Sequence, residues 1–267
     1  MARANCPQCG GTGWKTVAGP DGSSVAVLCE CTSTDREARL LARARIPKRY
    51  EHCDFDNYET DLYGAENSGW DRSMAQAKLL VEGFAREYSA ETEIGLLLMG
   101  PCGVGKTHLG VAALKDLARR GHDGIFYDYR ELLKEIQSSY NPVNQTTEMD
   151  VLAPVLTAPL LVLDDIGSSK PSAWALETVG HILNTRYNEK RVTLITSNYL
   201  DADSAAGPRP AGPRVHTLPT GQAVSGSEES LADRVGQRIR SRLYEMCRTV
   251  EITAPDYRRE ARHAGLH

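Results

Sequence analysis

The chain has 267 residues, a length typical of one main domain with a smaller addition. Its composition, 41% hydrophobic and 25% charged, is ordinary for a globular protein, and no stretch approaches the roughly 20 uninterrupted apolar residues of a membrane helix. The N-terminal sequence MARANCPQCG lacks the apolar core of a signal peptide, so we expect a cytoplasmic protein without a membrane partner. A formal net charge of -4 argues against binding nucleic acid by bulk attraction and leaves only local basic clusters to consider.

Four of the seven cysteines lie near the N-terminus in two pairs, Cys6 with Cys9 and Cys29 with Cys31. Segments shorter than about 40 residues seldom fold without a metal or a disulfide, and disulfides are rare in a reducing compartment. We therefore predict a structural Zn²⁺ held by all four thiolates within residues 1–32. An iron–sulfur cluster or uncoordinated thiols are the alternatives. The other cysteines are interpreted as ordinary packing residues: Cys53, Cys102 and Cys247.

Residues 33–70 contain the most basic segment of the chain. The sequence DREARLLARARIPKRY, from residue 35, predicts a helix followed by a break at Pro47. Its charges form either a solvated helix face or a surface for a partner or DNA. The basic positions are Arg36, Arg39, Arg43, Arg45, Lys48 and Arg49.

Strands and helices alternate in the main domain, which we place at residues 71–267. Short apolar runs predict buried strands, and apolar residues at helical spacing predict helices between them. This alternation implies an α/β fold, a parallel sheet with helices on both faces. Residues 201–229 are rich in Ala, Gly, Pro and Ser without apolar periodicity, which predicts a disordered insertion. The expected strands are 94–99, 124–129, 160–163, 192–196 and 249–252, and the expected helices are 74–88, 107–121, 130–140, 173–187 and 230–247.

The strongest motif is the sequence GPCGVGKT, which starts at residue 100, follows an expected strand and opens an expected helix. Its glycines let backbone N–H groups surround a polyphosphate, and the helix N-terminus adds its positive dipole end. Lys106 can reach the β- and γ-phosphates, and the Thr107 hydroxyl can hold Mg²⁺. We predict that ATP and Mg²⁺ bind here. The predicted nucleotide contacts are Gly100, Pro101, Cys102, Gly103, Val104, Gly105, Lys106, Thr107 and His108.

Polar residues end two further expected strands. Asp164 and Asp165 follow an apolar run, and carboxylates there emerge at the sheet edge that carries the glycine loop. Asp164 fits the Mg²⁺ role, directly or through water, and Asp165 fits the role of orienting the attacking water. Asn198, in the sequence TSN that starts at Thr196, would lie between these groups, where its amide can position water or sense the γ-phosphate.

Four motifs in order resemble the DnaC/DnaI/IstB branch of the AAA+ ATPases. They are GPCGVGKTHL, LLVLDDIG, ILNTRYNEKRVTLITSN and the pair RIRSRLYEM and PDYRR. The phrase RIPKRYEHCDFDNYE also resembles the segment that leads into the ATPase core of these helicase loaders. The resemblance runs from residue 46 to 259, interrupted by residues 201–229. It implies a P-loop AAA+ fold and ATP hydrolysis at sites between self-associated subunits.

The resemblance also implies roles for several arginines. By match to GxRxxxR, Arg238 is the candidate finger that reaches the neighbouring subunit's γ-phosphate; Arg242 is the alternative and Arg234 a weaker one. Arg258, in PDYR, matches the second sensor arginine, which contacts nucleotide in its own subunit. Arg186 falls in a family-typical phrase with either an interface or a structural role.

Three side chains follow the second expected strand, where related initiators contact single-stranded DNA: Arg130, Lys134 and Tyr140. The resemblance implies single-stranded DNA as a partner there. The chain departs from the AAA+ pattern in two ways. Asp165 stands where most members have Glu, and residues 201–229 form an atypical insertion before the finger helix.

Three functions fit these motifs. The leading hypothesis is an ATP-dependent loader of the replicative DNA helicase, with the four-cysteine module, which is similar in placement to that of DnaI-like loaders, gripping the helicase. The second is an IstB-like helper of transposition that acts on double-stranded DNA. The third is a nucleotide-gated adaptor with negligible turnover.

Overall fold

The core of the computed structural model is a parallel sheet with strand order β4-β5-β6-β3-β9, five strands within the described residues. Its strands are β3 (Gly95–Met99), β4 (Gly124–Asp128), β5 (Leu160–Asp164), β6 (Val192–Ser197) and β9 (Cys247–Glu251). This confirms the expected α/β class, and β6 lies between β3 and β5 as predicted. The structure describes residues 5–18, 22–60, 69–141, 146–201, 215–217, 223–225, 229–254 and 256–258.

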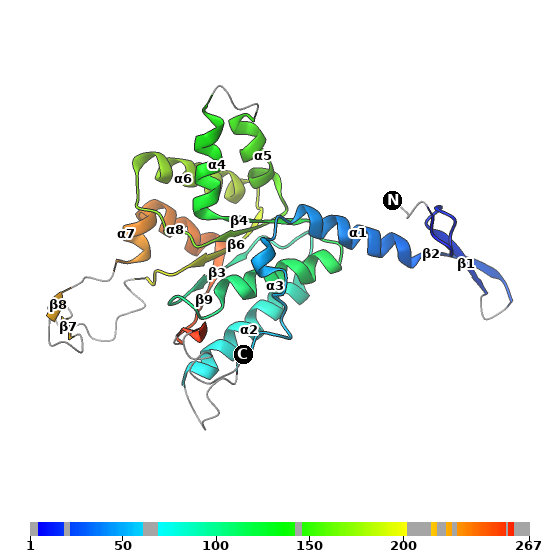
Figure 1. Cartoon of the computed structure of the whole chain (residues 1–267), viewed down its shortest axis with the longest axis horizontal. Helices are drawn as coiled ribbons and strands as arrows, with labels where there is room; N and C mark the ends of the chain where they lie inside the picture. Colours follow the sequence, from blue (N-terminus) through cyan, green and yellow to red (C-terminus); the bar gives the residue numbers. More distant parts are fainter. Residues whose placement is uncertain are drawn as a thin grey trace.

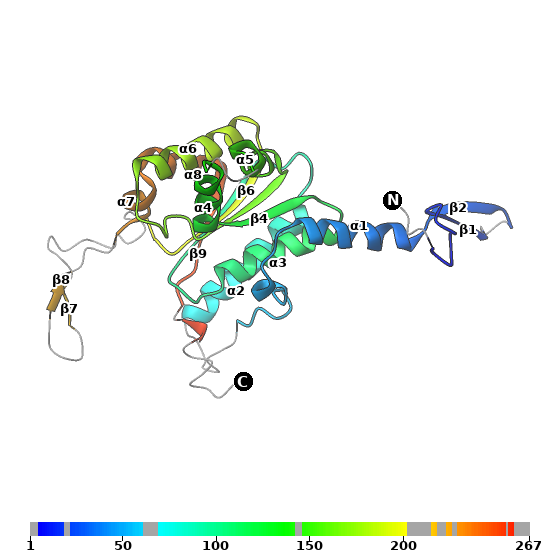
Figure 2. The ribbon, with the colours of Figure 1, turned by 45° about the horizontal axis from the view of Figure 1, so that its top comes forward.

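Helices cover both faces of this sheet (Figures 1 and 2). The side chains of β3 show why. Leu97 belongs to one apolar cluster, together with residues of the helices on that face, whereas Leu96 and Leu98 belong to the other. Successive side chains of a strand point to opposite faces, so a fully apolar strand needs two covering layers. One layer holds α4 (Tyr129–Ser139), α5 (Glu148–Thr157), α6 (Ala173–Asn188), α7 (Leu231–Val235) and α8 (Gln237–Met246), and the other holds α2 (Gly69–Glu87) and α3 (Lys106–Arg119).

The N-terminal part is an antiparallel hairpin of β1 (Trp14–Ala18) and β2 (Ser24–Leu28), followed by α1 (Glu30–Arg43). Figure 1 shows the hairpin at the far end of α1 from the sheet. The helix begins five residues earlier than expected, directly after Cys29, so Cys31 lies in its first turn. The cysteine module and the basic helix are therefore one continuous unit rather than two segments. A short 3-10 turn, Lys48–Tyr50, follows Pro47.

The expected helix at 230–247 is two helices, α7 and α8, separated by Gly236. Gly236 has φ +82°, a backbone conformation that other residues rarely adopt and that cannot continue a helix. Ser230 and Asp233 form a capping box at the start of α7. The sequence pattern missed the break because its apolar residues keep helical spacing across the glycine.

Most of the expected insertion, residues 201–229, lies outside the described residues. Two short strands are described within it, β7 (Val215–Thr217) and β8 (Ala223–Ser225), which pair antiparallel. Asp201, its first residue, is only 3% exposed and accepts hydrogen bonds from Arg240 and Tyr244. This carboxylate therefore belongs to the packed core.

Among the described residues, each helix is too short or too polar to span a bilayer.

Candidate functional site: the glycine loop and the strand ends

The glycine loop between β3 and α3 has the backbone conformation that its sequence predicts. Gly103 and Gly105 both have φ +84°. A Cβ at Gly103 would stand 1.8 Å from the Asp256 carboxylate, and one at Gly105 would stand 2.4 Å from the Tyr58 ring. Glycine is therefore required at both positions by conformation and by space. The loop leads directly into the N-terminus of α3, where a helix dipole favours phosphate.

Lys106 is buried at the first position of α3, with 6% of its surface exposed. Its Nζ donates to the carbonyl oxygens of Gly100 at 2.8 Å and Pro101 at 2.7 Å. Burial lowers the pKa of Lys106 to about 8, and the positive charge of Arg258 adds to this effect. The ammonium group is thus held inside the loop, where a phosphate would restore its full charge.

A hydrogen-bond network joins the glycine loop to the ends of β5 and β6. The Thr107 hydroxyl donates to Asp164 Oδ1 at 2.8 Å, and the Thr196 hydroxyl donates to the same oxygen at 2.7 Å. Burial raises the pKa of Asp164 to about 6, although both hydroxyl donors lower it. A hydroxyl and a carboxylate are hard oxygen ligands of the kind that Mg²⁺ prefers. The two residues predicted to hold Mg²⁺ are therefore brought together.

Asp165 and Asn198 also meet at this edge. Asn198 Nδ2 donates to Asp165 Oδ1 at 2.5 Å, and Arg130 lies 3.8 Å from Asp165 Oδ2. Asp165 has φ +60°, and its backbone N–H donates to the Thr196 hydroxyl at 2.8 Å. Burial raises the pKa of Asp165, an effect that the charge of Arg130 opposes. The arrangement can orient a water molecule between Asp165 and the loop.

Two distant segments pack against the glycine loop. From the N-terminal side, the Tyr58 hydroxyl donates to the Val104 carbonyl at 2.9 Å, and the Tyr58 ring lies edge-on to His108 with centroids 5.4 Å apart. From the C-terminal side, the Tyr257 N–H donates to the Gly103 carbonyl at 3.1 Å. This contact places Arg258, which is exposed and 3.6 Å from Asp256, beside the loop.

The arginines of the α6 to α8 region divide into buried and exposed ones. Arg186 is fully buried and donates to the Val155 and Ala158 carbonyls, so its role is structural. Arg234 is 8% exposed and donates to the Gly167 carbonyl at 2.7 Å, which leaves it poorly placed to reach another subunit.

Two arginines on α8 are more accessible. Arg238 is exposed, and the guanidinium of Arg242 lies 4.3 Å from the centroid of the Tyr187 ring. Both line a groove of about 890 Å³ between α6 and α8.

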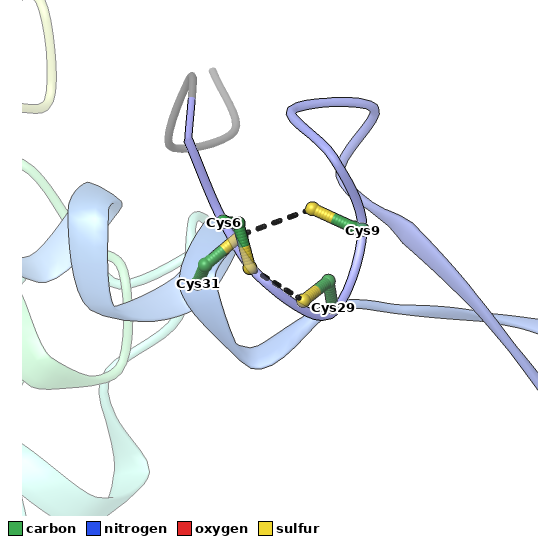
Figure 3. Close-up of side chains that lie close together, drawn as sticks. All are labelled: Cys6, Cys9, Cys29 and Cys31. Atoms are coloured by element: carbon green, nitrogen blue, oxygen red, sulfur yellow. Dashed lines mark hydrogen bonds between the residues drawn. The ribbon is translucent and has the colours of Figure 1, made fainter.

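The four N-terminal cysteines converge at the base of the hairpin (Figure 3). Their sulfur atoms lie within 4.8 Å of one another, with Cys6 to Cys29 at 3.7 Å and Cys9 to Cys31 at 3.5 Å. Four sulfurs at 2.3 Å from a tetrahedral Zn²⁺ would be about 3.8 Å apart. The Gly13 N–H also donates to Cys9 Sγ at 3.4 Å, as expected for a thiolate ligand. The donor set therefore fits zinc.

Sequence reasoning missed two contributors to the nucleotide edge. The sequence TSN indicates only that the strand ends in polar residues, whereas the Thr196 hydroxyl contacts both Asp164 and the Asp165 backbone. Tyr58 lies 46 residues before its partner Val104, a separation that no local pattern reveals. Its place in the phrase that resembles the loader linker was the available signal.

Comparisons with known proteins agree with this geometry. A family model described as IstB-like ATP binding protein matches residues 26–203, more than half of the chain. The replicative helicase loader DnaC of Buchnera aphidicola subsp. Baizongia pistaciae is 27% identical over 160 residues, 60% of this chain and 61% of that protein. DnaC of Escherichia coli K12 is 25% identical over 160 residues, again 60% of this chain and 61% of that protein. The chain therefore spans about 61% of the length of these relatives.

The chain is also similar to solved structures. The crystal structure of the DnaC helicase loader is 30% identical, with a TM-score of 0.57 over 77% of this chain and 99% of that one. The crystal structure of DnaI, 23% identical with a TM-score of 0.54 over 79% and 94% of the two chains, shares the fold. With the glycine loop, the acidic strand end and the family match in agreement, the chain belongs to the IstB-like ATP-binding protein family.

Proposed function

We propose that this protein is an ATP-dependent loader of the replicative DNA helicase. The observation that carries the ATPase part is the network in which Thr107 and Thr196 both donate to Asp164 beside the glycine loop. When bound, Mg²⁺ would neutralise phosphate charge at Thr107 and Asp164, while Asp165 and Asn198 would orient water. The relatives named replicative helicase loader support the choice of client.

Two substitutions test the nucleotide site, one through nucleotide binding and the other through hydrolysis. Lys106→Ala removes the phosphate-binding charge, so nucleotide binding should be lost. Asp165→Asn keeps the loop intact, so nucleotide should bind while hydrolysis stops. Lys170→Ala, at an exposed lysine remote in sequence from the loop, is the matched control. Normal turnover in both site variants would remove the proposed assignment.

Hydrolysis at an inter-subunit site is the second part of the proposal. Arg238 is exposed on α8 and is the proposed finger, and self-association would place it on the neighbour's nucleotide. An arginine finger contributes roughly 10³–10⁵ in rate. Arg238→Ala should therefore bind ATP normally in isolation but lose most turnover when assembled. If Arg242→Ala alone has that effect, the finger is Arg242.

We further propose that the cysteine module holds Zn²⁺ and that the hairpin next to it contacts the helicase. Trp14 and Leu28 pair directly across the hairpin and are 55% and 62% exposed. Large apolar side chains that share one exposed face are typical of a protein contact surface. The basic helix α1 would connect this surface to the ATPase core.

Single-stranded DNA is the remaining proposed partner. Lys134 and Tyr140 are candidate contacts on and just after α4, and the Tyr140 ring is 51% exposed. Arg130, by contrast, lies 3.8 Å from Asp165 and is better placed to serve the nucleotide edge. Loss of DNA binding in Lys134→Ala, with ATP binding retained, would support the α4 surface.

An IstB-like transposition helper is the second candidate, favoured by the family model that covers residues 26–203. The two candidates differ in their client. A pull-down with the replicative helicase of the same organism should retain the full-length protein and lose the Cys6→Ser/Cys9→Ser variant. No capture of either form, with ATP binding intact, would favour the transposition helper or an adaptor.

A further inference from the structure

A second group of metal-ligating side chains lies away from the four-cysteine module, between the linker and the first turn of α3. His52, Cys53 and His108 each offer a ligand atom, and these atoms lie within 4.8 Å of one another. Cys53 Sγ is 3.9 Å from His52 Nε2. Ligand atoms at 2.3 Å (sulfur) and about 2.05 Å (nitrogen) from a tetrahedral Zn²⁺ would be about 3.6 Å apart. The distance from Cys53 to His52 is close to that value.

Hydrogen bonds close the linker turn that carries two of these ligands. Asn57 Nδ2 donates to the His52 carbonyl at 2.6 Å, and Asn57 Oδ1 accepts from the Asp54 N–H at 2.9 Å. The Cys53 N–H donates to the Tyr50 carbonyl at 3.0 Å. A turn fixed at both ends presents its side chains with little loss of conformational freedom, which favours metal binding.

The third ligand, His108, is oriented by its own hydrogen bond. Its Nε2 donates to the Asp54 carbonyl at 2.8 Å, which leaves Nδ1 with the lone pair of the ring. Metal-binding histidines usually donate their other ring N–H to a carbonyl or carboxylate in this way. The nearby cation, Lys115, is paired with Asp54 at 2.7 Å, so the site does not face an uncompensated positive charge.

We propose that His52, Cys53 and His108 bind a borderline-soft divalent ion such as Zn²⁺, with water as the fourth ligand. One thiolate and two imidazoles suit Zn²⁺, and Co²⁺ is its spectroscopic substitute. Cys53 is 2% exposed and His52 is exposed, so the ion would enter from the His52 side. The ion would tie the linker to the residue after Thr107 and so hold the start of α3 in place.

The experiment is a Co²⁺ and Zn²⁺ titration of the full chain. Wild type should bind two equivalents of metal, and His52→Ala should bind one. The Cys6→Ser/Cys9→Ser variant should keep the linker equivalent, with weaker thiolate-to-cobalt absorption per ion because only one sulfur ligates. His181→Ala, at another exposed histidine, is the matched control and should bind as wild type does.

A second readout separates metal binding from a folding defect. Added Zn²⁺ should raise the melting midpoint of the Cys6→Ser/Cys9→Ser variant, and this rise should disappear when His52→Ala is added. His52 is exposed, so its substitution should leave the metal-free midpoint unchanged. Equal stoichiometry in wild type and His52→Ala, or the same Zn²⁺-dependent rise with and without His52, would overturn the proposal.

Discussion

Thr196 links the Asp164 side chain to the Asp165 backbone at the nucleotide edge. It is 1% exposed, and its hydroxyl both donates to Asp164 and accepts from the Asp165 N–H. One small side chain therefore contacts both the Asp164 carboxylate and the Asp165 backbone. Serine can make the same two bonds, whereas valine has nearly the same shape and can make neither.

Thr196→Val should destabilise the fold by about 1–3 kcal/mol, because a buried N–H and a buried carboxylate each lose a partner. It should also weaken Mg²⁺-dependent nucleotide binding. Chemical denaturation and nucleotide titration measure these effects, with Thr196→Ser as the control that retains both. Wild-type stability in Thr196→Val would show that the hydroxyl does not hold the Asp164 carboxylate and the Asp165 backbone in place.

The pKa of Asp164 predicts how Mg²⁺ binding depends on pH. Burial raises this pKa from 3.8 to about 6, so the folded chain holds a proton on Asp164 below that pH. The proton competes with Mg²⁺, and affinity should fall about tenfold between pH 7 and pH 5. Magnesium titrations at fixed nucleotide measure this. A flat profile over that range would mean that Asp164 is ionised throughout, contrary to the raised pKa.

Residue roles were predictable where a motif fixes both the type and the position of a side chain. The glycine loop with Lys106, and the pair Asp164 and Asp165, lie where the spacing predicted. The role of Arg186 could not be predicted in this way. Its sequence context left two roles open, and only its four hydrogen bonds to buried partners identify a structural one.

At the scale of elements, the sheet strands were predictable because fully apolar runs that end at polar residues have few other interpretations. Helix boundaries were less predictable. Gly236 divides one periodic pattern into α7 and α8, and Pro154 lies inside α5, a helix to which the sequence analysis assigned no element. Gly236 is a local break that the apolar periodicity masks, whereas α5 runs through Pro154 against local propensity and buries Val151, Leu152 and Val155.

Asp201 connects the strand that ends at the nucleotide edge to α8, the helix that carries the proposed finger Arg238. It lies four residues after Ser197, and Arg240 Nε donates to its Oδ2 at 2.8 Å. Asp201→Asn should cost about 3 kcal/mol, because it replaces the buried carboxylate that accepts from Arg240 and Tyr244 with a neutral amide. Hydrogen exchange should show α8 opening more readily, and turnover of the assembled protein should fall while ATP binding is retained.

The control for this substitution is Asp123→Asn, at a carboxylate that is 36% exposed and 3.7 Å from Arg43. A partly exposed ion pair of that kind contributes at most about 1 kcal/mol. Equal effects of the two substitutions would mean that the Asp201 contact is a surface pair without influence on α8.

At the scale of the whole molecule, the hairpin lies at the end of α1 that points away from the sheet and its covering helices (Figure 2). The C-terminal half of α1 is anchored to the core, since the Phe126 N–H donates to the Ala44 carbonyl at 2.8 Å and Arg36 donates to the Gly121 carbonyl. The sequence predicted the cysteine module and the basic helix as separate segments. The structure joins them, because α1 begins directly after Cys29 and includes Cys31.

The exposed face of the hairpin should therefore act separately from the ATPase site. Trp14→Ala/Leu28→Ala should lose helicase capture while zinc content and ATP binding stay at wild-type levels. Val17→Ala, at an exposed residue on the opposite face of the same strand, is the matched control. Full capture by the double variant would place the helicase contact elsewhere.

Unwinding by the replicative helicase of the same organism, on a DNA fork covered by single-strand binding protein, tests the central claim most directly. The account predicts that this protein with ATP stimulates unwinding. It also predicts that Lys106→Ala and Cys6→Ser/Cys9→Ser each fail, the first through the nucleotide site and the second through the helicase contact. Absence of stimulation by a wild-type protein that binds ATP and zinc normally would contradict the assignment as a helicase loader.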